Sequence, residues 1–282
     1  MSDESSPLSV RKILIAANAS PHSQAALTLA VQLAAAVGAE VEGLFVEDEQ
    51  LLRAADLPFA AEVRTHSQPP TPLSDRRVER QLRRQAERAE AELQRATESL
   101  DVPHSFRVVR GPVTHELRAA AAEADLLALG KTSTDSSRQR LGSTARALLS
   151  ECGASVLVLR SAAPLSQPVL TYFDGSAAGA RALTLAARCV RRSDAGRLRV
   201  LLPARDPETT RRLRDEVHTH CRGLDIETEI HVLSPSEADQ LAVLAHHAGG
   251  GLMVLPRTCE PVSAAPFQQF LYELDRPLLL VQ

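Results

Sequence analysis

Short apolar runs alternate along this chain with longer segments in which apolar residues recur every three or four positions. An apolar run at residues 13–17 is followed, after a turn at 18–21, by an Ala- and Leu-rich segment that ends near Gly38. Another apolar run follows at residues 41–46. Runs of this length predict buried strands and the periodic segments predict helices, so the chain opens with a β-α-β unit.

The same order of elements returns in the second half of the chain. It consists of a predicted strand at residues 169–173, a turn at 174–176, a helix to about residue 192 and a strand at 198–202. A repeat of this size is a whole folding unit rather than a short solenoid module. We therefore predict a first domain at residues 8–162 and a second, shorter domain at residues 166–282.

Both halves also end alike, with a strand, a loop, a helix and a final strand. The final strands are predicted at residues 155–159 and 277–281. Strands that alternate with helices predict an α/β fold with five parallel strands in each half. Because the edge of such a sheet needs cover, and two similar domains can supply it to each other, we predict two open five-stranded sheets, flanked by helices and packed as an intramolecular pseudo-dimer.

The first half is longer because of an insertion before its third strand. After a Pro-rich stretch at residues 69–72, a helix is predicted from Ser74 onward, with Ser74 as its N-cap. Glutamates alternate in the sequence with the many arginines of this helix, so we interpret its polar side as a solvated face rather than a nucleic-acid patch. The apolar positions at helical spacing are Val78, Leu82, Ala86, Ala89, Leu93 and Leu100.

Composition limits the function classes further. The chain has 282 residues, a formal net charge of -3 and a pI of about 6.3, which give no general attraction to nucleic acid or to anionic membranes. The polar start of the sequence is unlike a signal peptide, and no apolar run is long enough to cross a bilayer. The four cysteines form no CxxC motif. We expect a reduced, cytoplasmic protein.

The loop after the fourth strand carries the most specific candidate chemistry. Gly130 and Lys131 follow an apolar run directly, and Gly142 precedes a predicted helix that begins with Ser143 and Thr144. Glycines allow backbone N–H groups to approach an anion, and a helix N-terminus favours negative charge. The alternative is a connection whose glycines only turn the chain. A Walker-type P-loop is excluded because its first glycine would fall at Asp125.

Over residues 10–282 the chain resembles the universal stress protein family in its tandem, two-domain form. The resemblance depends on ILIAANASPHSQAALTLAVQLAAAVGAEV, on the loop from Gly130 to Thr144, on the closing GASVLVLR, and in the second half on VLTYFDGSAAGARALTLA and RPLLLVQ. In nucleotide-binding members the loop pattern G-x2-G-x9-G-[ST] surrounds the phosphates of ATP. The resemblance implies an open sheet of the adenine nucleotide alpha hydrolase-like type, in strand order 3-2-1-4-5.

That strand order makes strands one and four neighbours, with helices leaving on opposite faces, and ligands bind at such switch points. The resemblance implies that the first domain binds ATP or a related adenine nucleotide there, with the phosphates at the loop and the ribose at the turn after strand one. Mg²⁺ is expected only together with the nucleotide. The implied nucleotide-binding residues are Ala17, Asn18, Gly130, Lys131, Ser133, Gly142, Ser143 and Thr144.

This sequence departs from the family's pattern in both halves. In the first, Ser133 replaces the second glycine, the spacing to Gly142 is one residue short, and Asn18 replaces the usual aspartate. The second half keeps Asp174, Gly175 and Ser176, but Pro256 stands where the first half has Gly130, and no later glycine follows. Proline offers no N–H to a phosphate, so we expect a degenerate second site without nucleotide.

The sequence gives little support for catalysis or for metal binding. His218 and Cys221 could share a metal, but nothing nearby completes a set of four ligands, so no metal site is predicted. No catalytic residue is predicted either, and slow ATP hydrolysis is the most that the loop suggests. The expected function is regulatory or protective in a stress response, with self-association and no nucleic-acid or membrane partner. The alternative is an interaction scaffold that binds no nucleotide, with degenerate sites in both domains.

Overall fold

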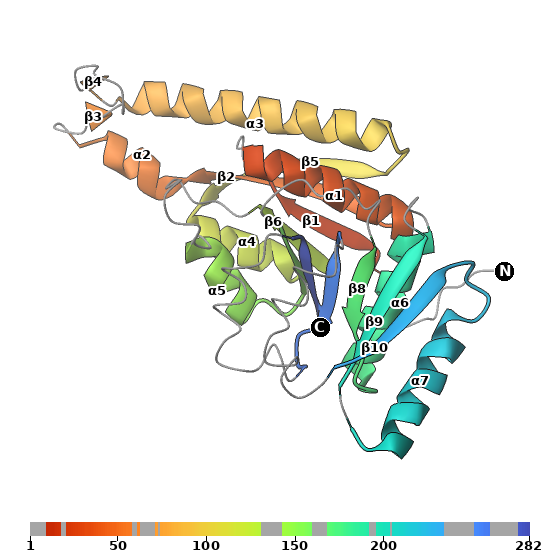
Figure 1. The fold of residues 1–282 in the computed structure, drawn as a ribbon. Coiled ribbons are helices and arrows are strands. Elements are labelled where there is room, and N and C mark those ends of the chain that lie inside the picture. The colour runs from red at the N-terminus through yellow and green to blue at the C-terminus, as the bar shows by residue number, and fades with distance from the viewer. Residues whose placement is uncertain are drawn as a thin grey trace.

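The computed structural model describes eleven ranges of the chain. They are residues 10–17, 21–57, 61–62, 71–72, 74–130, 143–159, 168–191, 196–203, 205–233, 251–259 and 276–282. Ten of the strands in these ranges form one continuous sheet, and two short strands, β3 (Ala61–Glu62) and β4 (Thr71–Pro72), pair with each other. Figure 1 shows how the two halves of the chain contribute neighbouring parts of the molecule.

The first half contributes five parallel strands to the sheet, in the predicted order 3-2-1-4-5. Their apolar residues alternate between the two faces, and both faces are covered, as parallel sheets require. From the outer edge inward the strands are β5 (His104–Gly111), β2 (Glu40–Asp48), β1 (Lys12–Ala16), β6 (Leu126–Gly130) and β7 (Ser155–Leu159).

The second half repeats the same order with five shorter parallel strands. From the other outer edge inward they are β10 (Glu227–Val232), β9 (Arg197–Leu202), β8 (Val169–Tyr172), β11 (Met253–Pro256) and β12 (Leu278–Val281). The predicted α/β fold is therefore confirmed, and the strand order 3-2-1-4-5 occurs in each half.

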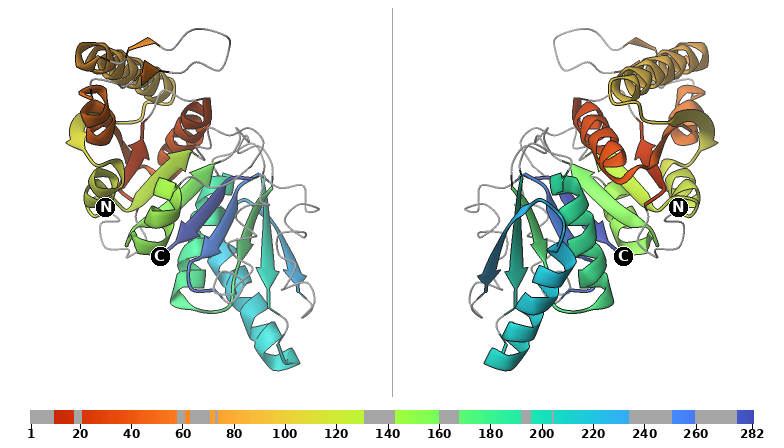
Figure 2. Two further views of the ribbon diagram at one scale, coloured as in Figure 1. Left: turned by 90° about the vertical axis from the view of Figure 1, so that its left-hand side faces the viewer. Right: turned by 90° about the vertical axis from the view of Figure 1, so that its right-hand side faces the viewer.

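The two sets of strands meet at β7 and β12, which pair antiparallel, with Leu279 opposite Leu157. The predicted mutual cover of the two sheet edges thus takes the form of main-chain pairing, so that two five-stranded sheets become one of ten strands. Its strand directions turn steadily from one end to the other, as twisted sheets do (Figure 2). The domain boundaries at 8–162 and 166–282 stay a prediction, because residues 1–9 and 160–167 lie outside the described ranges.

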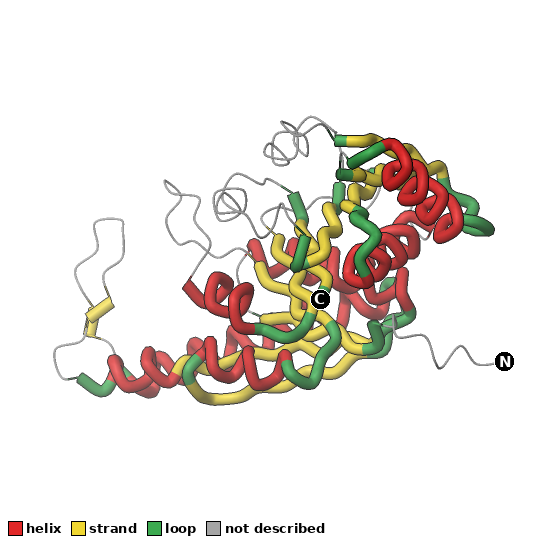
Figure 3. Tube along the Cα trace, turned by 90° about the horizontal axis from the view of Figure 1, so that it is seen from below, coloured by secondary structure: helices red, strands yellow, loops and turns green. Residues whose placement is uncertain are grey.

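In the first half, helices cover both faces of the sheet. Ile13 and Ile15 of β1 belong to the core under α1, whereas Leu14 faces the opposite core, under α4 and α5. Seen from below, the strands form a layer with helices beside it (Figure 3). The helices of this half are α1 (Pro21–Val37), α2 (Glu49–Ala55), α3 (Asp75–Glu98), α4 (Val113–Ala121) and α5 (Ser143–Glu151).

Two further helices, α6 (Ala177–Arg191) and α7 (Pro207–Cys221), pack on the second half. α6 is the counterpart of α1 in the repeat, and the two helices contact each other across the junction. One hydrophobic core therefore contains residues of both halves, including Leu33 of α1 and Cys189 of α6. This shared core adds apolar burial to the hydrogen bonds that join β7 and β12.

The inserted helix α3 lies along the outside of the first half, over α1 and α2 (Figure 1). Its predicted apolar positions are buried as far as Leu93, but Leu100 lies beyond the helix and is 44% exposed. Thr97 takes the next inward position instead, and its hydroxyl donates to the carbonyl of Leu93. Ser74 occupies the predicted N-cap position, although its side chain makes no capping hydrogen bond.

Candidate functional site

The predicted switch point lies between β1 and β6 of the first half. These strands are direct neighbours, with Ile15 opposite Ala128. At the end of β1 the backbone N–H of Ala17 still donates to the carbonyl of Leu44 in β2, at 2.9 Å. Gly130 ends β6 and pairs with Leu159 of β7. The two strands therefore diverge toward different neighbours at their carboxyl ends, which is the geometry that opens a crevice in α/β sheets.

Helix α5 begins at the same edge of the sheet. It must run back from the carboxyl ends of the strands to their amino ends, because the backbone N–H of Ser155 at the start of β7 donates to the carbonyl of Asp125, just before β6. Ser143 at its first position is exposed, and Thr144 is half-buried. The N-terminus of α4 lies beside it, with the hydroxyl oxygens of Thr114 and Thr144 3.5 Å apart.

The two adjacent helix starts differ in their electrostatics. The first turn of α4 contains Glu116, whose carboxylate already faces Gly111 at the end of β5. The first turn of α5 contains no acidic residue. Negative charge favours a helix N-terminus; α4 carries such a charge in its own first turn, whereas the first turn of α5 carries none.

The structure brings part of the predicted nucleotide site together. Ala17 and Gly130 lie at the carboxyl ends of neighbouring strands, and Ser143 and Thr144 open the helix at that edge. The other four predicted residues lie outside the described ranges; they are Asn18, Lys131, Ser133 and Gly142. Sequence reasoning missed Thr114, which nothing in the loop pattern indicates because it belongs to the preceding helix.

A hollow beside Ala17 is very small. It lies between β1, β2, α1 and α3, with Ile15, Gly43 and Leu93 among its lining residues. Its volume is about 10 Å³. A cavity of this size holds a single water at most, so no purine ring fits into it.

The second switch point, between β8 and β11, uses its polar residues to shape its own turn. The Asp174 carboxylate accepts from the backbone N–H of Ser176 at 2.9 Å, and the Ser176 hydroxyl accepts from the backbone N–H of Gly179 at 2.9 Å. Ser176 is thus the N-cap of α6, although the sequence suggested a degenerate ligand site here. Phe173, fully buried, stands where the first half has the small Ala17.

Gly175 in the same turn is fixed by backbone conformation and by packing. Its φ is +82°, a conformation that side chains disfavour. A Cβ atom at this position would approach Leu213 of α7 to 2.8 Å. The second half therefore keeps Asp174, Gly175 and Ser176 in roles that belong to folding.

At the end of β11, the other side of the second switch point contains Pro256 and Arg257. By the offset that relates Gly130 to Pro256, Arg257 is the counterpart of Lys131. Its guanidinium donates to the carbonyls of Leu149 and Cys152, at the C-terminal end of α5. A cation at a helix C-terminus is favourable, so this arginine joins the second half to the helix that opens the first site.

The described part of the chain offers no site suited to metal binding or to a reactive thiol. There, no group of three or more His, Cys, Asp or Glu side chains is placed to hold a metal ion. Burial raises the pKa of the Cys189 thiol to about 12, and burial also raises that of the half-buried Cys221. Both thiols therefore stay protonated near neutral pH. Among the described helices, none has the length and apolar character needed to cross a membrane.

The 3-2-1-4-5 order of strands, with its switch point between β1 and β6, fits the adenine nucleotide alpha hydrolase-like class. The sequence profile of the Universal stress protein family matches residues 9–160, more than half of the chain. The chain therefore belongs to the universal stress protein family. No curated protein matches the sequence.

Solved structures agree with this fold over nearly the whole chain. A universal stress protein from Archaeoglobus fulgidus DSM 4304 aligns with a TM-score of 0.67 and 16% identity, covering 95% of this chain and 97% of its own. A functionally unknown protein from Pseudomonas aeruginosa PAO1 aligns with a TM-score of 0.61 and 15% identity, covering 97% and 92%. At these identities the likeness concerns the fold, and both comparisons include the second half of the chain.

Proposed function

We propose that this universal stress protein binds ATP or a related adenine nucleotide in its first half only, as part of a regulatory stress response. The single observation that carries the proposal is the first turn of α5, which contains no acidic residue and begins at the edge of the sheet where β1 and β6 end. Phosphates would lie at Gly130, Ser143 and Thr144, together with Lys131, Ser133 and Gly142 of the loop between them. Asn18 would accept from the ribose, and Mg²⁺ would accompany the phosphates.

The second half supports the proposal by contrast. Its aspartate, glycine and serine are engaged in the turn and cap before α6, and Arg257 is directed to α5. Pro256 offers no N–H. A nucleotide at this second switch point would have to displace contacts that stabilise the fold.

A matched pair of serine substitutions tests the proposal. Ser143→Asp places a carboxylate where phosphate would bind, yet an acidic residue in the first turn favours the helix, so α5 should remain folded. Ser176→Asp replaces one good N-cap with another at the second switch point. Saturating ATP with Mg²⁺ should stabilise the wild type by about 2.7 kcal/mol at 100 times Kd.

Calorimetry and thermal melting measure the outcome. We expect Ser143→Asp to weaken ATP binding at least tenfold and Ser176→Asp to leave it unchanged. Equal losses in both variants would place nucleotide in both halves, and absence of binding by the wild type would reject the proposal. The same samples, assayed for phosphate release, report whether any slow hydrolysis accompanies binding.

One observation favours a scaffold that binds no nucleotide. The hollow beside Ala17, at about 10 Å³, offers no room for a purine ring. In that case neither serine variant would alter a response to ATP, because there would be none. If the protein is such a scaffold, we expect it to self-associate through the sheet edges at β5 and β10. Val108 of β5 is 47% exposed. Sedimentation over a range of protein concentrations tests it.

A further inference from the structure

The outer side of α3 carries a row of arginines whose arrangement differs from what their sequence suggests. Six arginines and only two glutamates occur between residues 76 and 88. At about 100° per residue, Arg77, Arg84 and Arg88 lie within about 40° of one another round the helix, and Arg80 lies beside them. We call Arg77, Arg80, Arg84 and Arg88 the arginine stripe.

Two carboxylates of α3 are engaged with residues outside the helix. Glu79 pairs with Arg110 of β5, with 3.5 Å between the charged atoms, and Glu92 accepts from Gln24 of α1 at 2.8 Å. Glu87 lies on the flank of the stripe, three residues from Arg84 and about 60° from it round the helix. Within the described ranges, Arg80, Arg84 and Arg88 have no carboxylate partner. The side chains of Arg80, Arg84 and Arg88 are exposed, as a solvated face requires, but glutamates do not balance their charge as the sequence suggested.

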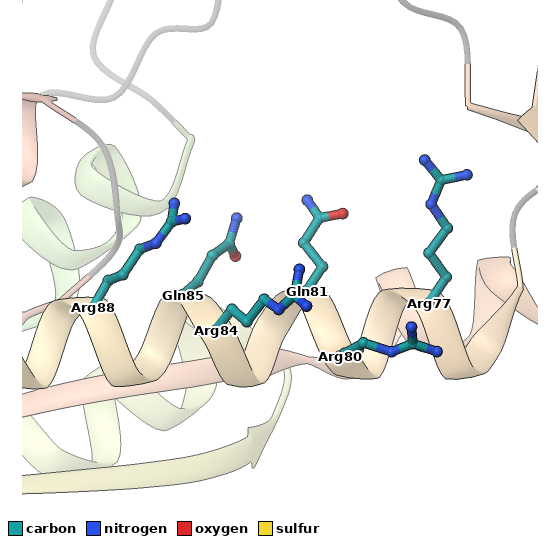
Figure 4. A pocket seen from close by; sticks show the side chains of 6 residues that line it. All are labelled: Arg77, Arg80, Gln81, Arg84, Gln85 and Arg88. Carbon is teal, nitrogen blue, oxygen red and sulfur yellow. The ribbon is translucent and has the colours of Figure 1, made fainter.

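The stripe is a shaped surface. Arg77, Arg80, Arg84 and Arg88, with Gln81 and Gln85, line a hollow of about 480 Å³, and all of them come from α3. Figure 4 shows these side chains directed outward, away from the strands behind the helix. Arg80, Arg84 and Arg88 follow one another at about 6 Å along the helix axis and about 40° round it, so they form a slanted row of positive charge.

Folding does not account for this arrangement. Arg77 stands in the first turn of α3, where the helix dipole opposes positive charge. Arg80 and Arg84, and Arg84 and Arg88, are like-charged pairs four residues apart, which destabilise a helix. The apolar side of α3 is already buried against α2 and the sheet. An arrangement that opposes helix stability at an exposed surface is typical of binding.

The chemistry of the stripe selects among polyanions. Protein interfaces need an apolar centre, and membrane-surface helices insert an apolar face; the six lining residues provide neither. Single-stranded nucleic acid stacks on aromatic side chains, and none lines this hollow. Duplex DNA is contacted through its phosphates by Arg and Gln side chains, and its wide major groove admits an α-helix, whereas the deep, narrow major groove of duplex RNA does not.

We propose that the arginine stripe of α3 binds the phosphate backbone of duplex DNA without reading its sequence. The overall charge of -3 argued against nucleic acid, but this inference concerns a local surface in which positive charge is concentrated. The surface is separate from the switch point and does not depend on nucleotide binding there.

The test measures binding of the full-length protein to a fluorescein-labelled duplex DNA of thirty base pairs and mixed sequence, by anisotropy at several salt concentrations. Three phosphate contacts, by Arg80, Arg84 and Arg88, predict a slope of about -2.7 for log K against log salt, or about a fortyfold loss between 50 and 200 mM. Arg84→Gln/Arg88→Gln should bring the slope to about -0.9, or about a threefold loss.

Arg76→Gln/Arg83→Gln is the matched control, because it removes two charges from the other flank of the same helix. Glutamine is a good helix former, and circular dichroism checks that both variants keep α3. The control should retain the wild-type slope and an affinity within about twofold. Equal losses in the two variants would mean diffuse attraction and would overturn the proposal.

Competitors decide the identity of the polyanion. Unlabelled duplex DNA should displace the probe at lower concentration than single-stranded DNA, duplex RNA, polyglutamate or phosphatidylserine vesicles. Stronger displacement by any of these, or no binding by the wild type at 50 mM salt, would reject duplex DNA as the partner.

Discussion

The two switch points of this molecule occupy equivalent places in a duplicated fold and differ in what their polar residues do. In the second half, Asp174 and Ser176 bond to nearby backbone, and Arg257 reaches across to α5. In the first half, the start of α5 contains no acidic residue. Residue types that suggest a ligand site are therefore poor evidence until their own hydrogen bonds are known. The second half keeps the family's aspartate, Asp174, but its carboxylate already accepts a hydrogen bond from the backbone of Ser176.

Gly175→Ala is the substitution with the largest expected effect on this comparison. It requires a positive φ from alanine and brings a Cβ atom against Leu213, so we expect a loss of about 2–4 kcal/mol in unfolding free energy. Urea unfolding measures it. Gly153→Ala is the control, because a Cβ there meets open space, and it should cost less than about 1 kcal/mol. Similar losses from both would mean that the turn at Gly175 is not the tight element described.

Arg257→Ala tests the link between the halves. Removing the guanidinium leaves the carbonyls of Leu149 and Cys152 without their charged donor, which should cost about 2 kcal/mol. Amide hydrogen exchange should rise first in α5, the helix of the first site. Arg257→Lys should restore part of the loss, and Arg214→Ala, at an exposed position of α7, should change little. Unchanged exchange in α5 would contradict the link.

Thr171→Val is the smallest of these changes and should stabilise the protein. Thr171 is fully buried in β8, and its hydroxyl has no hydrogen-bond partner among the described residues. It stands where the first half has Ile15, by the offset that relates Asn18 to Asp174. Replacing an unpaired buried hydroxyl with a methyl group should add about 1 kcal/mol, measured by urea unfolding. A loss of stability would show that the hydroxyl has a partner.

The sequence predicted elements well where a periodic pattern determines them. The alternation of apolar runs and helical segments gave five strands in each half and located α3 almost to its ends. It misplaced Leu100, because an apolar residue in phase with a helix still lies outside when the helix stops at Glu98. The hydrogen bonds of Thr97 show why the inward position passes to a threonine.

The candidate site was less predictable, because its chemistry depends on partners that are distant in sequence. Arg257 and Cys152 are more than a hundred residues apart, and no local pattern joins them. Likewise, Glu79 of α3 pairs with Arg110 of the later strand β5 rather than with an arginine of its own helix. Residue types give the candidates, but only the fold shows which of them are already engaged.

Because β7 and β12 belong to one chain, their antiparallel contact does not depend on the concentration of the protein. Two separate five-stranded domains would meet only as often as their concentration allows. Because one chain carries both, the contact is intramolecular, at an effective concentration set by the connecting segment rather than by the amount of protein. The two halves therefore stay paired at low protein concentrations, at which two separate five-stranded domains would dissociate.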